Sequence, residues 1–154
     1  MIDSYGRQIS YLRLSVTELC NLRCRYCMPA EGVCKRRHEE MLAQEEMLRA
    51  VGVAATRGMH KLRITGGEPL LNRDFFDIMG YAHEQGFRWG MTSNATLITP
   101  EVAQRLAEVG MGTISVSIDG LRETHDELRG LPGGYDRAMV GIQNLIDVGA
   151  FNVI

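Results

Sequence analysis

The chain has 154 residues, of which 45% are hydrophobic and 23% charged, and its 17 Lys and Arg against 19 Asp and Glu give a net charge of -2. This is the composition of one ordinary globular domain, and it excludes a disordered or fibrous chain and a general basic field for nucleic acid or an anionic membrane. No apolar run approaches the roughly 20 residues that cross a bilayer, and the first ten residues lack the apolar core of a signal peptide. We therefore expect a cytoplasmic protein with neither nucleic-acid nor membrane partners.

A strand followed by an amphipathic stretch recurs along the chain. Short β-branched runs predict strands at 11–16, 61–65, 88–93 and 113–118, with a fifth strand starting at 152. The stretches between them predict helices, of which 40–57 is the longest, and Thr99 and Pro100 form a typical helix start. Asn72 is the expected cap of another helix. A glycine, the usual helix stop, precedes each later strand: Gly58, Gly86, Gly110 and Gly149.

This repeat predicts an α/β fold with a parallel sheet and right-handed crossovers. Within the strands, apolar residues alternate with polar ones, so each strand has one face of each kind. Residues of the predicted polar face include Arg13, Lys61, Arg63, Thr92 and Ser117. If helices cover the apolar face, the polar face lines a ligand cavity. The alternative is a solvated sheet face, which is uncommon in parallel sheets.

Three of the four cysteines lie close together in the loop after the first strand. Cys20, Cys24 and Cys27 form the pattern C-x3-C-x2-C. Disulfides are rare in cytosolic proteins, and soft thiolate ligands suit zinc or an iron–sulfur cluster. A structural zinc site would need a fourth ligand, such as Cys34 or His38, whereas a cubane cluster on three cysteines leaves one iron open for chemistry. The spacing alone leaves both readings open.

The segment 20–27 closely resembles the cluster motif of the radical S-adenosylmethionine (radical SAM) enzymes. Further matching segments are Gly66-Gly67-Glu68-Pro69, Thr92-Ser93-Asn94 and Ser115-Val116-Ser117-Ile118-Asp119-Gly120. The resemblance implies a partial (βα)6 barrel. We expect residues 1–154 to form an incomplete radical SAM core of about four βα units plus the start of a fifth strand, unable to complete its reaction without a C-terminal remainder.

The resemblance also implies a 4Fe-4S cluster on Cys20, Cys24 and Cys27 and S-adenosylmethionine on its open iron. Reductive cleavage of that cofactor would yield methionine and a 5′-deoxyadenosyl radical. Implied cofactor contacts are Tyr26, Gly66, Gly67, Glu68, Asn94 and Ser117. We expect the two glycines to let the backbone approach the cofactor, so that Gly67→Val would block its binding and spare the iron. Cys34 is expected outside the cluster and His125 at a surface or turn position.

Within the family, the opening segment 3–17 and the segments 27–29 and 61–69 resemble the GTP cyclase of molybdenum cofactor biosynthesis. That resemblance implies GTP as the small-molecule substrate, a cyclic pyranopterin product, an external electron donor and a homodimer of the longer protein. Implied GTP contacts are Arg13, Lys61, Arg63 and Thr92. Inward cations are costly to bury unless an anion meets them, and a triphosphate is such an anion.

Other parts of the chain favour a different substrate. Segments 117–130 and 132–138, and Ala95 where the cyclases usually show glycine, resemble radical enzymes that mature peptides or modify haem precursors and carry extra clusters. We treat the cyclase as the leading hypothesis because its matches include the strands that face the cavity. A third alternative is a non-catalytic metal module that uses all four cysteines. Such a module would leave the Gly66-Gly67-Glu68-Pro69 segment and the inward cations without a role.

Overall fold

The computed structural model describes residues 2–27 and 42–154 and shows a parallel α/β fold. Its elements are β1 (Tyr11–Ser15), α1 (Gln44–Thr56), β2 (Lys61–Thr65), the 3-10 turn η2 (Pro69–Leu71), α2 (Phe75–Glu84), β3 (Arg88–Ser93), α3 (Pro100–Glu108), β4 (Met111–Val116), α4 (Arg122–Arg129), α5 (Gly134–Val148) and β5 (Asn152–Val153). None of the helices in these ranges is long and apolar enough to span a membrane.

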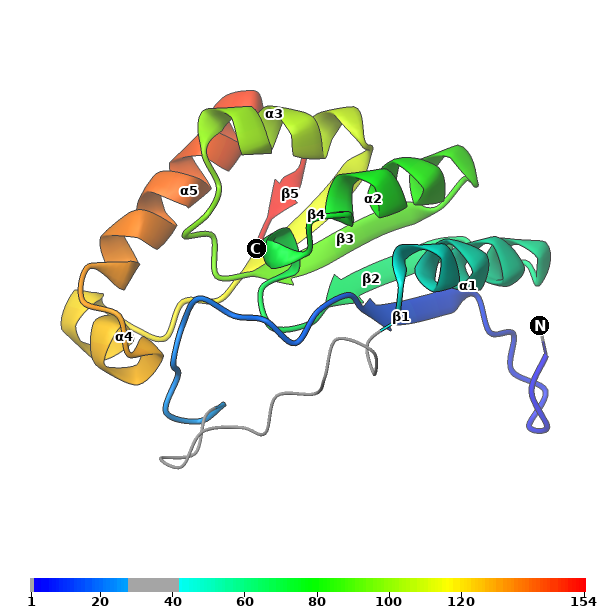
Figure 1. Ribbon diagram of the computed structural model, residues 1–154, viewed down its shortest axis with the longest axis horizontal. Helices are drawn as coiled ribbons and strands as arrows, with labels where there is room; N and C mark the ends of the chain where they lie inside the picture. Colours follow the sequence, from blue (N-terminus) through cyan, green and yellow to red (C-terminus); the bar gives the residue numbers. More distant parts are fainter. Residues whose placement is uncertain (1, 28–41) are drawn as a thin grey trace.

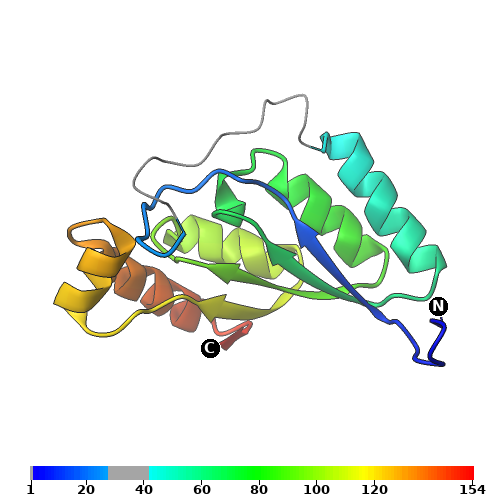
Figure 2. The same ribbon diagram turned by 90° about the horizontal axis from the view of Figure 1, so that it is seen from below.

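The five strands form one sheet in the order β1-β2-β3-β4-β5, and every neighbouring pair is parallel. Helices α1, α2, α3 and α5 lie on one face of this sheet, and the carboxyl ends of the strands point toward α4, which packs against α5 (Figures 1 and 2). The core lies between the sheet and these helices. Its fully buried side chains include Ile64, Phe75, Ile78, Met79, Met91, Leu106, Ile114 and Leu145.

Most predicted elements are confirmed. β2 and β3 have the predicted bounds, whereas β4 begins at Met111, two residues earlier than expected. The Thr99 side chain caps α3 by accepting a hydrogen bond from the Val102 amide at 3.2 Å. The four predicted stop glycines all adopt left-handed φ angles between 66° and 82°. Alternation, the glycine stops and the Thr99 cap therefore located the repeat correctly.

Two predictions about helices are wrong. Asn72 does not cap α2: its side chain accepts from the Asp74 amide at 2.8 Å and donates to the Val16 carbonyl at 2.7 Å, tying the turn before α2 to the end of β1. A separate helix, α4, precedes α5. It lacks an apolar stripe, since its buried residues are His125 and Arg129, so hydrophobic periodicity did not reveal it.

Helix α5 packs closely against the loop after β3. A Cβ on Gly141 would lie 2.1 Å from the carbonyl oxygen of Ala95, a residue that itself has a φ of 60°. Gly80 in α2 is a matched contrast, because a Cβ there would meet only a Val109 methyl at 3.9 Å. The absence of a side chain is thus required in α5 but not in α2.

We expect Gly141→Ala to lower the free energy of unfolding by about 1–3 kcal/mol, because the new methyl forces backbone apart. Gly80→Ala should be neutral or raise it by up to about 1 kcal/mol through helix propensity. Urea unfolding of both variants measures the difference. Equal effects of the two substitutions would contradict this packing.

Candidate functional site

The three predicted ligand cysteines lie in one loop at the carboxyl end of β1. Cys24 is buried, Cys20 is half-buried and Cys27 is exposed, and all three are free thiols. A turn brings the last two together, since the Cys27 amide donates to the Cys24 carbonyl at 3.0 Å. Desolvation, followed by the nearby thiols of Cys24 and Cys20, raises the pKa of Cys27. The thiols are therefore close enough to disfavour each other's ionisation.

This donor set fits an iron–sulfur cluster. Within residues 2–27 and 42–154, no three His, Cys, Asp or Glu side chains are arranged as a ready site for a single metal ion. Cluster cysteines bind different iron atoms, so their sulfurs need not converge on one point. Cys34 and His38, the alternative fourth ligands, lie outside the described residues. A bound cluster would offset the repulsion between the thiolates, because its iron atoms stabilise the deprotonated cysteines.

The loop that carries the three cysteines (residues 17–27, the cysteine loop) is held by the loop that follows β2 (residues 66–68, the glycine loop). The Gly67 amide donates to the Thr17 carbonyl at 2.8 Å, and the Glu68 amide donates to the Leu19 carbonyl at 2.7 Å. Gly66 has a φ of 148°, and a Cβ there would lie 2.5 Å from the Thr17 carbonyl oxygen. At Gly67 a Cβ would lie 2.1 Å from the Leu19 carbonyl oxygen.

These contacts correct one sequence-based expectation. The space beside Gly67 is filled by the backbone that leads into Cys20, so Gly67→Val would displace the cysteine loop itself. The expected separation between lost cofactor binding and retained iron therefore does not follow from this structure. Both glycines are needed first for the contact between two loops of the protein.

Glu68 is completely buried beneath these two loops. Its carboxylate accepts hydrogen bonds from the Ser93 hydroxyl and from the backbone amide of Asn94, both at 2.8 Å. Burial raises the pKa of Glu68, while the hydrogen bonds from Asn94 and Ser93 oppose that shift. Direct contact between this carboxylate and a ligand would require these bonds to rearrange. In the structure Glu68 ties the end of β2 to the end of β3.

Asn94 extends this connection to the cysteine loop through residues that sequence analysis did not single out. The side-chain amide of Asn94 donates to the side-chain oxygen of Asn21 at 2.9 Å, and the side-chain amide of Asn21 donates to the Thr96 hydroxyl at 2.8 Å. The Thr96 hydroxyl donates to the Asn94 side-chain oxygen at 2.6 Å. This closed ring fixes Asn21, the residue after Cys20, against the end of β3.

The end of α4 holds the cysteine loop from the other side. The Arg23 amide donates to the Arg129 carbonyl at 3.1 Å, and the Arg25 amide donates to the Leu128 carbonyl at 2.9 Å. The Arg129 guanidinium lies 3.8 Å from the Cys24 sulfur, placing a cation beside a predicted cluster ligand. Sequence analysis missed Arg129. The only local feature that marks its position is the following Gly130, a typical helix stop, which ends α4 directly after Arg129.

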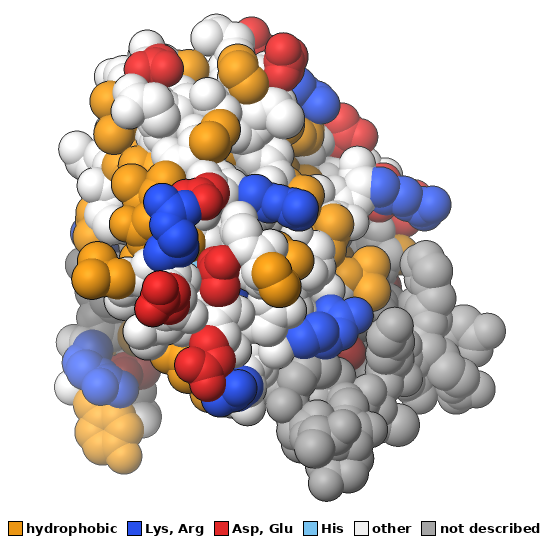
Figure 3. Space-filling model, turned by 90° about the vertical axis from the view of Figure 1, so that its left-hand side faces the viewer, with side chains coloured by type: hydrophobic (Ala, Val, Ile, Leu, Met, Phe, Trp, Pro, Cys, Tyr) orange, Lys and Arg blue, Asp and Glu red, His pale blue; other side chains and the backbone are white. Residues whose placement is uncertain are grey.

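Tyr26, one of the predicted cofactor contacts, also interacts with Arg129 and Asp119. Its hydroxyl is hydrogen-bonded to the Asp119 carboxylate, which is also paired with Arg129 at 2.8 Å. The Arg129 guanidinium carbon lies 5.5 Å from the centre of the Tyr26 ring. Burial, followed by the bond to Asp119, raises the pKa of Tyr26, so the phenol stays protonated. On this end of the molecule, charges of both signs are interspersed (Figure 3).

His125 is not a surface or turn residue, as the sequence suggested, but is buried in α4. Its Nδ1 atom accepts a hydrogen bond from the Asp119 amide at 3.2 Å, which requires an unprotonated Nδ1. The ring packs edge-on against Tyr135, with ring centres 5.8 Å apart. His125 therefore positions the Asp119 loop that meets Tyr26.

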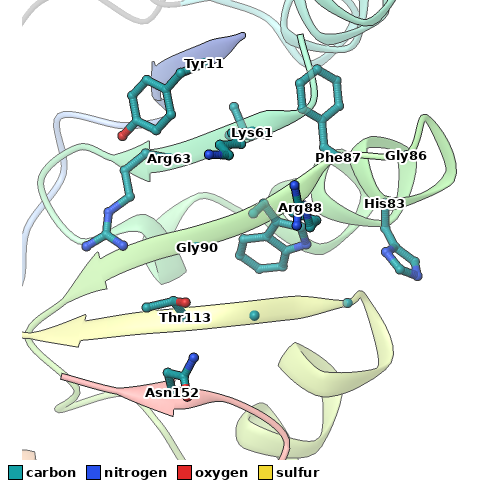
Figure 4. A pocket seen from close by; sticks show the side chains of 14 residues that line it. Tyr11, Lys61, Arg63, His83, Gly86, Phe87, Arg88, Gly90, Thr113 and Asn152 are labelled. Carbon is teal, nitrogen blue, oxygen red and sulfur yellow. The ribbon is translucent and has the colours of Figure 1, made fainter.

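The predicted substrate residues share the open face of the sheet. Arg63 donates to the Thr92 hydroxyl at 3.0 Å and the Ser115 hydroxyl at 2.6 Å, and Arg13 is its register partner on β1. Lys61 and Arg63 line a hollow of about 770 Å³ on this face (Figure 4). Arg13 and Thr92 are not among the described residues that line it, and Ser117 lies past the end of β4.

Comparisons with known proteins agree with this arrangement. The profile of the Radical SAM superfamily matches residues 14–154. The chain is 41% identical to GTP 3',8-cyclase of Alkaliphilus oremlandii, covering 97% of this chain and 47% of the relative. It is 42% identical to GTP 3',8-cyclase of Geobacter sulfurreducens (92% and 44%) and 39% identical to Molybdenum cofactor biosynthesis protein 1 of Mus musculus (97% and 24%). The chain thus spans half or less of the length of these relatives.

Solved structures show the same fold. Streptococcus suis SuiB bound to precursor peptide SuiA superposes with a TM-score of 0.75 at 23% identity, covering 94% of this chain and 32% of that chain. Native anSMEcpe with bound AdoMet also gives a TM-score of 0.75, at 22% identity, covering 93% of this chain and 42% of that chain. At these identities the likeness is one of fold.

Removing the Glu68 carboxylate should destabilise the chain strongly. We expect Glu68→Ala to lower the free energy of unfolding by about 3 kcal/mol or more, since it leaves a cavity and unpartnered donors on Ser93 and Asn94. Glu68→Gln, which can bond both groups, should cost about 1 kcal/mol or less. Urea unfolding measures both, with exposed Glu84→Ala as the control. A Glu68→Ala effect no larger than the control would refute the role given to this carboxylate.

His125 should make stability depend on pH. Burial, followed by the charge of Arg129, lowers the pKa of His125 below 6.5, and this outweighs the opposing effect of Asp119 and Asp126. The stability contributed by the neutral ring is present above the unfolded pKa and is lost as the pH falls through the folded pKa. His125→Asn keeps an acceptor for the Asp119 amide without titrating, so its urea-unfolding midpoint should decline less between about pH 7 and pH 5. Parallel declines in the two proteins would contradict this assignment.

Proposed function

Because the chain belongs to the radical SAM superfamily, we propose that it holds a 4Fe-4S cluster and S-adenosylmethionine at the carboxyl end of its sheet. The observation that carries this proposal is the cysteine loop, which is fixed by the glycine loop, by the Asn94 ring and by α4. Cys20, Cys24 and Cys27 are the proposed cluster ligands. A cluster held by these three thiolates would supply, once reduced, the electron for reductive cleavage of S-adenosylmethionine to methionine and a 5′-deoxyadenosyl radical.

The residues around this loop would position the cofactor. Asn94 and Ser117 follow neighbouring strands, and the Ser117 amide donates a hydrogen bond to the carbonyl of Ser93, the residue before Asn94, at 3.0 Å. Tyr26 is 58% exposed, its hydroxyl is held by Asp119 and the Arg129 guanidinium carbon lies 5.5 Å from its ring centre, so that the exposed part of the ring would contact the cofactor. The backbone of Gly66 and Gly67, with Glu68 buried behind it, completes the proposed cofactor side of the site.

The proposed substrate is GTP and the proposed reaction is its cyclisation to the pyranopterin precursor of molybdenum cofactor. Relatives of 39–42% identity named as enzymes or proteins of that pathway support this choice. The cations Arg13, Lys61 and Arg63 and the Thr92 hydroxyl lie on the open face, where they would bind the nucleotide. An external electron donor would reduce the cluster, and the longer protein would act as a homodimer.

One alternative keeps the cofactors and changes the substrate. A radical enzyme acting on a peptide or haem precursor would also use the cysteine loop, and the segments at 117–130 and 132–138 favour it. The structural likeness to SuiB and anSMEcpe adds only the shared fold, because the identities are 22–23%. The higher identity to GTP 3',8-cyclases favours GTP. Membership of the superfamily leaves no support for a non-catalytic four-cysteine metal module.

Iron content tests the cluster assignment without relying on turnover. After anaerobic reconstitution, we expect Cys20→Ala, Cys24→Ala and Cys27→Ala each to lose most of the iron bound by the wild type, because each removes one of three thiolates. Cys34→Ala serves as the control and should keep it. Equal iron loss in the control would favour a site made from all four cysteines.

Calorimetry tests the substrate assignment. We expect Arg63→Gln to weaken GTP binding about tenfold, as for a lost charged hydrogen bond, and to leave S-adenosylmethionine binding nearly unchanged. Arg49→Gln in α1 removes the same charge away from the open face and controls for net charge. No measurable GTP affinity in the reconstituted longer protein would turn the assignment toward the peptide or haem-precursor alternative.

A further inference from the structure

The hollow on the open face is formed by the amino-terminal halves of the strands, at the opposite end of the sheet from the cysteines. It has a volume of about 770 Å³, and its polar lining includes Tyr11, Lys61, Arg63, Arg88, Thr113 and Asn152, contributed by all five strands. Figure 4 shows Lys61 and Arg88 on adjacent strands at one end of this hollow, with Arg63 farther along β2. Arg88 is the one cation of this group that has no role in the proposal above.

The charge of this hollow is uncompensated. Lys61, Arg63 and Arg88 line it, and no Asp or Glu does so among the described residues. None of the ion pairs found within residues 2–27 and 42–154 includes these three cations. The partners of Arg63 are the neutral hydroxyls of Thr92 and Ser115, which leave its charge in place.

Strand pairing brings like charges together here. Lys61 and Arg88 are register partners across β2 and β3, and Arg13 and Arg63 are register partners across β1 and β2. Like charges directly opposite each other on neighbouring strands are destabilising. A Cβ at Gly90 would lie 2.5 Å from the Thr113 carbonyl oxygen and 3.3 Å from a guanidinium nitrogen of Arg63, so this position admits no side chain beside Arg63. Of these four cations, Lys61, Arg63 and Arg88 line the hollow.

A ligand with several adjacent negative charges would offset this repulsion, whereas a single carboxylate would meet only part of it. We infer that Arg88, together with its register partner Lys61, forms a subsite for the terminal phosphates of a polyphosphate ligand, and that Arg88 determines the preference for a triphosphate over a monophosphate. This inference rests on the proposed function for the nucleotide, but the charge arrangement also applies to an inorganic polyphosphate. Arg63 would bind the phosphates nearer the middle of the sheet.

The test compares Arg88→Gln with the wild type by calorimetry on the reconstituted chain, using GTP, GMP and inorganic tripolyphosphate at low and high salt. Arg137→Gln on α5 removes one charge outside the hollow and is the matched control. We expect Arg88→Gln to weaken GTP and tripolyphosphate binding about fivefold to tenfold, to change GMP binding less than about twofold, and to reduce the salt dependence. Circular dichroism checks that each variant is folded.

The outcomes separate the subsite from the proposed substrate. Loss of tripolyphosphate binding in Arg88→Gln, with no GTP binding by any protein, would support the subsite and refute GTP as the substrate. Tight GTP binding that Arg88→Gln leaves unchanged would refute the subsite and leave the substrate standing. Equal weakening by Arg137→Gln, or equal losses for GMP and GTP, would also overturn the subsite, because the effect would then reflect net charge or another part of the nucleotide.

Discussion

The candidate site depends on one contact, the hydrogen-bonded approach of the glycine loop to the loop that carries the cysteines. Two backbone bonds, from Gly67 to Thr17 and from Glu68 to Leu19, align the loops, and the missing side chains of Gly66 and Gly67 let them come this close. The buried Glu68 carboxylate then anchors the pair to the end of β3. Since a buried carboxylate is costly unless hydrogen-bonded, these partners decide whether the arrangement is stable.

The parallel sheet separates two kinds of chemistry along the same strands. At the carboxyl ends lie the thiols, Tyr26 and the Asp119–Arg129 pair, where both signs of charge are balanced. Toward the amino ends of the open face, the cations of the hollow have no acidic partners among the described residues. The cations belong to the strands, whose side chains alternate so that one face packs on the helices and the other carries polar residues, whereas the groups at the carboxyl ends belong to loops and to α4.

Sequence patterns predicted what depends on local order. The alternation in β2, the glycine stops and the Thr99 cap each follow from the conformations of a few successive residues, and the structure confirms them. The roles that depended on tertiary contacts were not predictable in this way. Nothing local indicates that Glu68 is covered or that His125 is buried, because the partners of both lie on other elements or across a turn. Hydrophobic periodicity did not predict helix α4, because the side chains that it buries are polar.

The central claim is that the cysteine loop holds a redox cluster to which S-adenosylmethionine binds directly. Electron paramagnetic resonance of the reduced, anaerobically reconstituted chain, recorded with and without S-adenosylmethionine, tests it most directly. We expect a 4Fe-4S signal whose g values shift when the cofactor is added, because an iron without a cysteine ligand would gain one. A cluster signal that the cofactor leaves unchanged, or a protein that binds zinc and assembles no cluster, would contradict it.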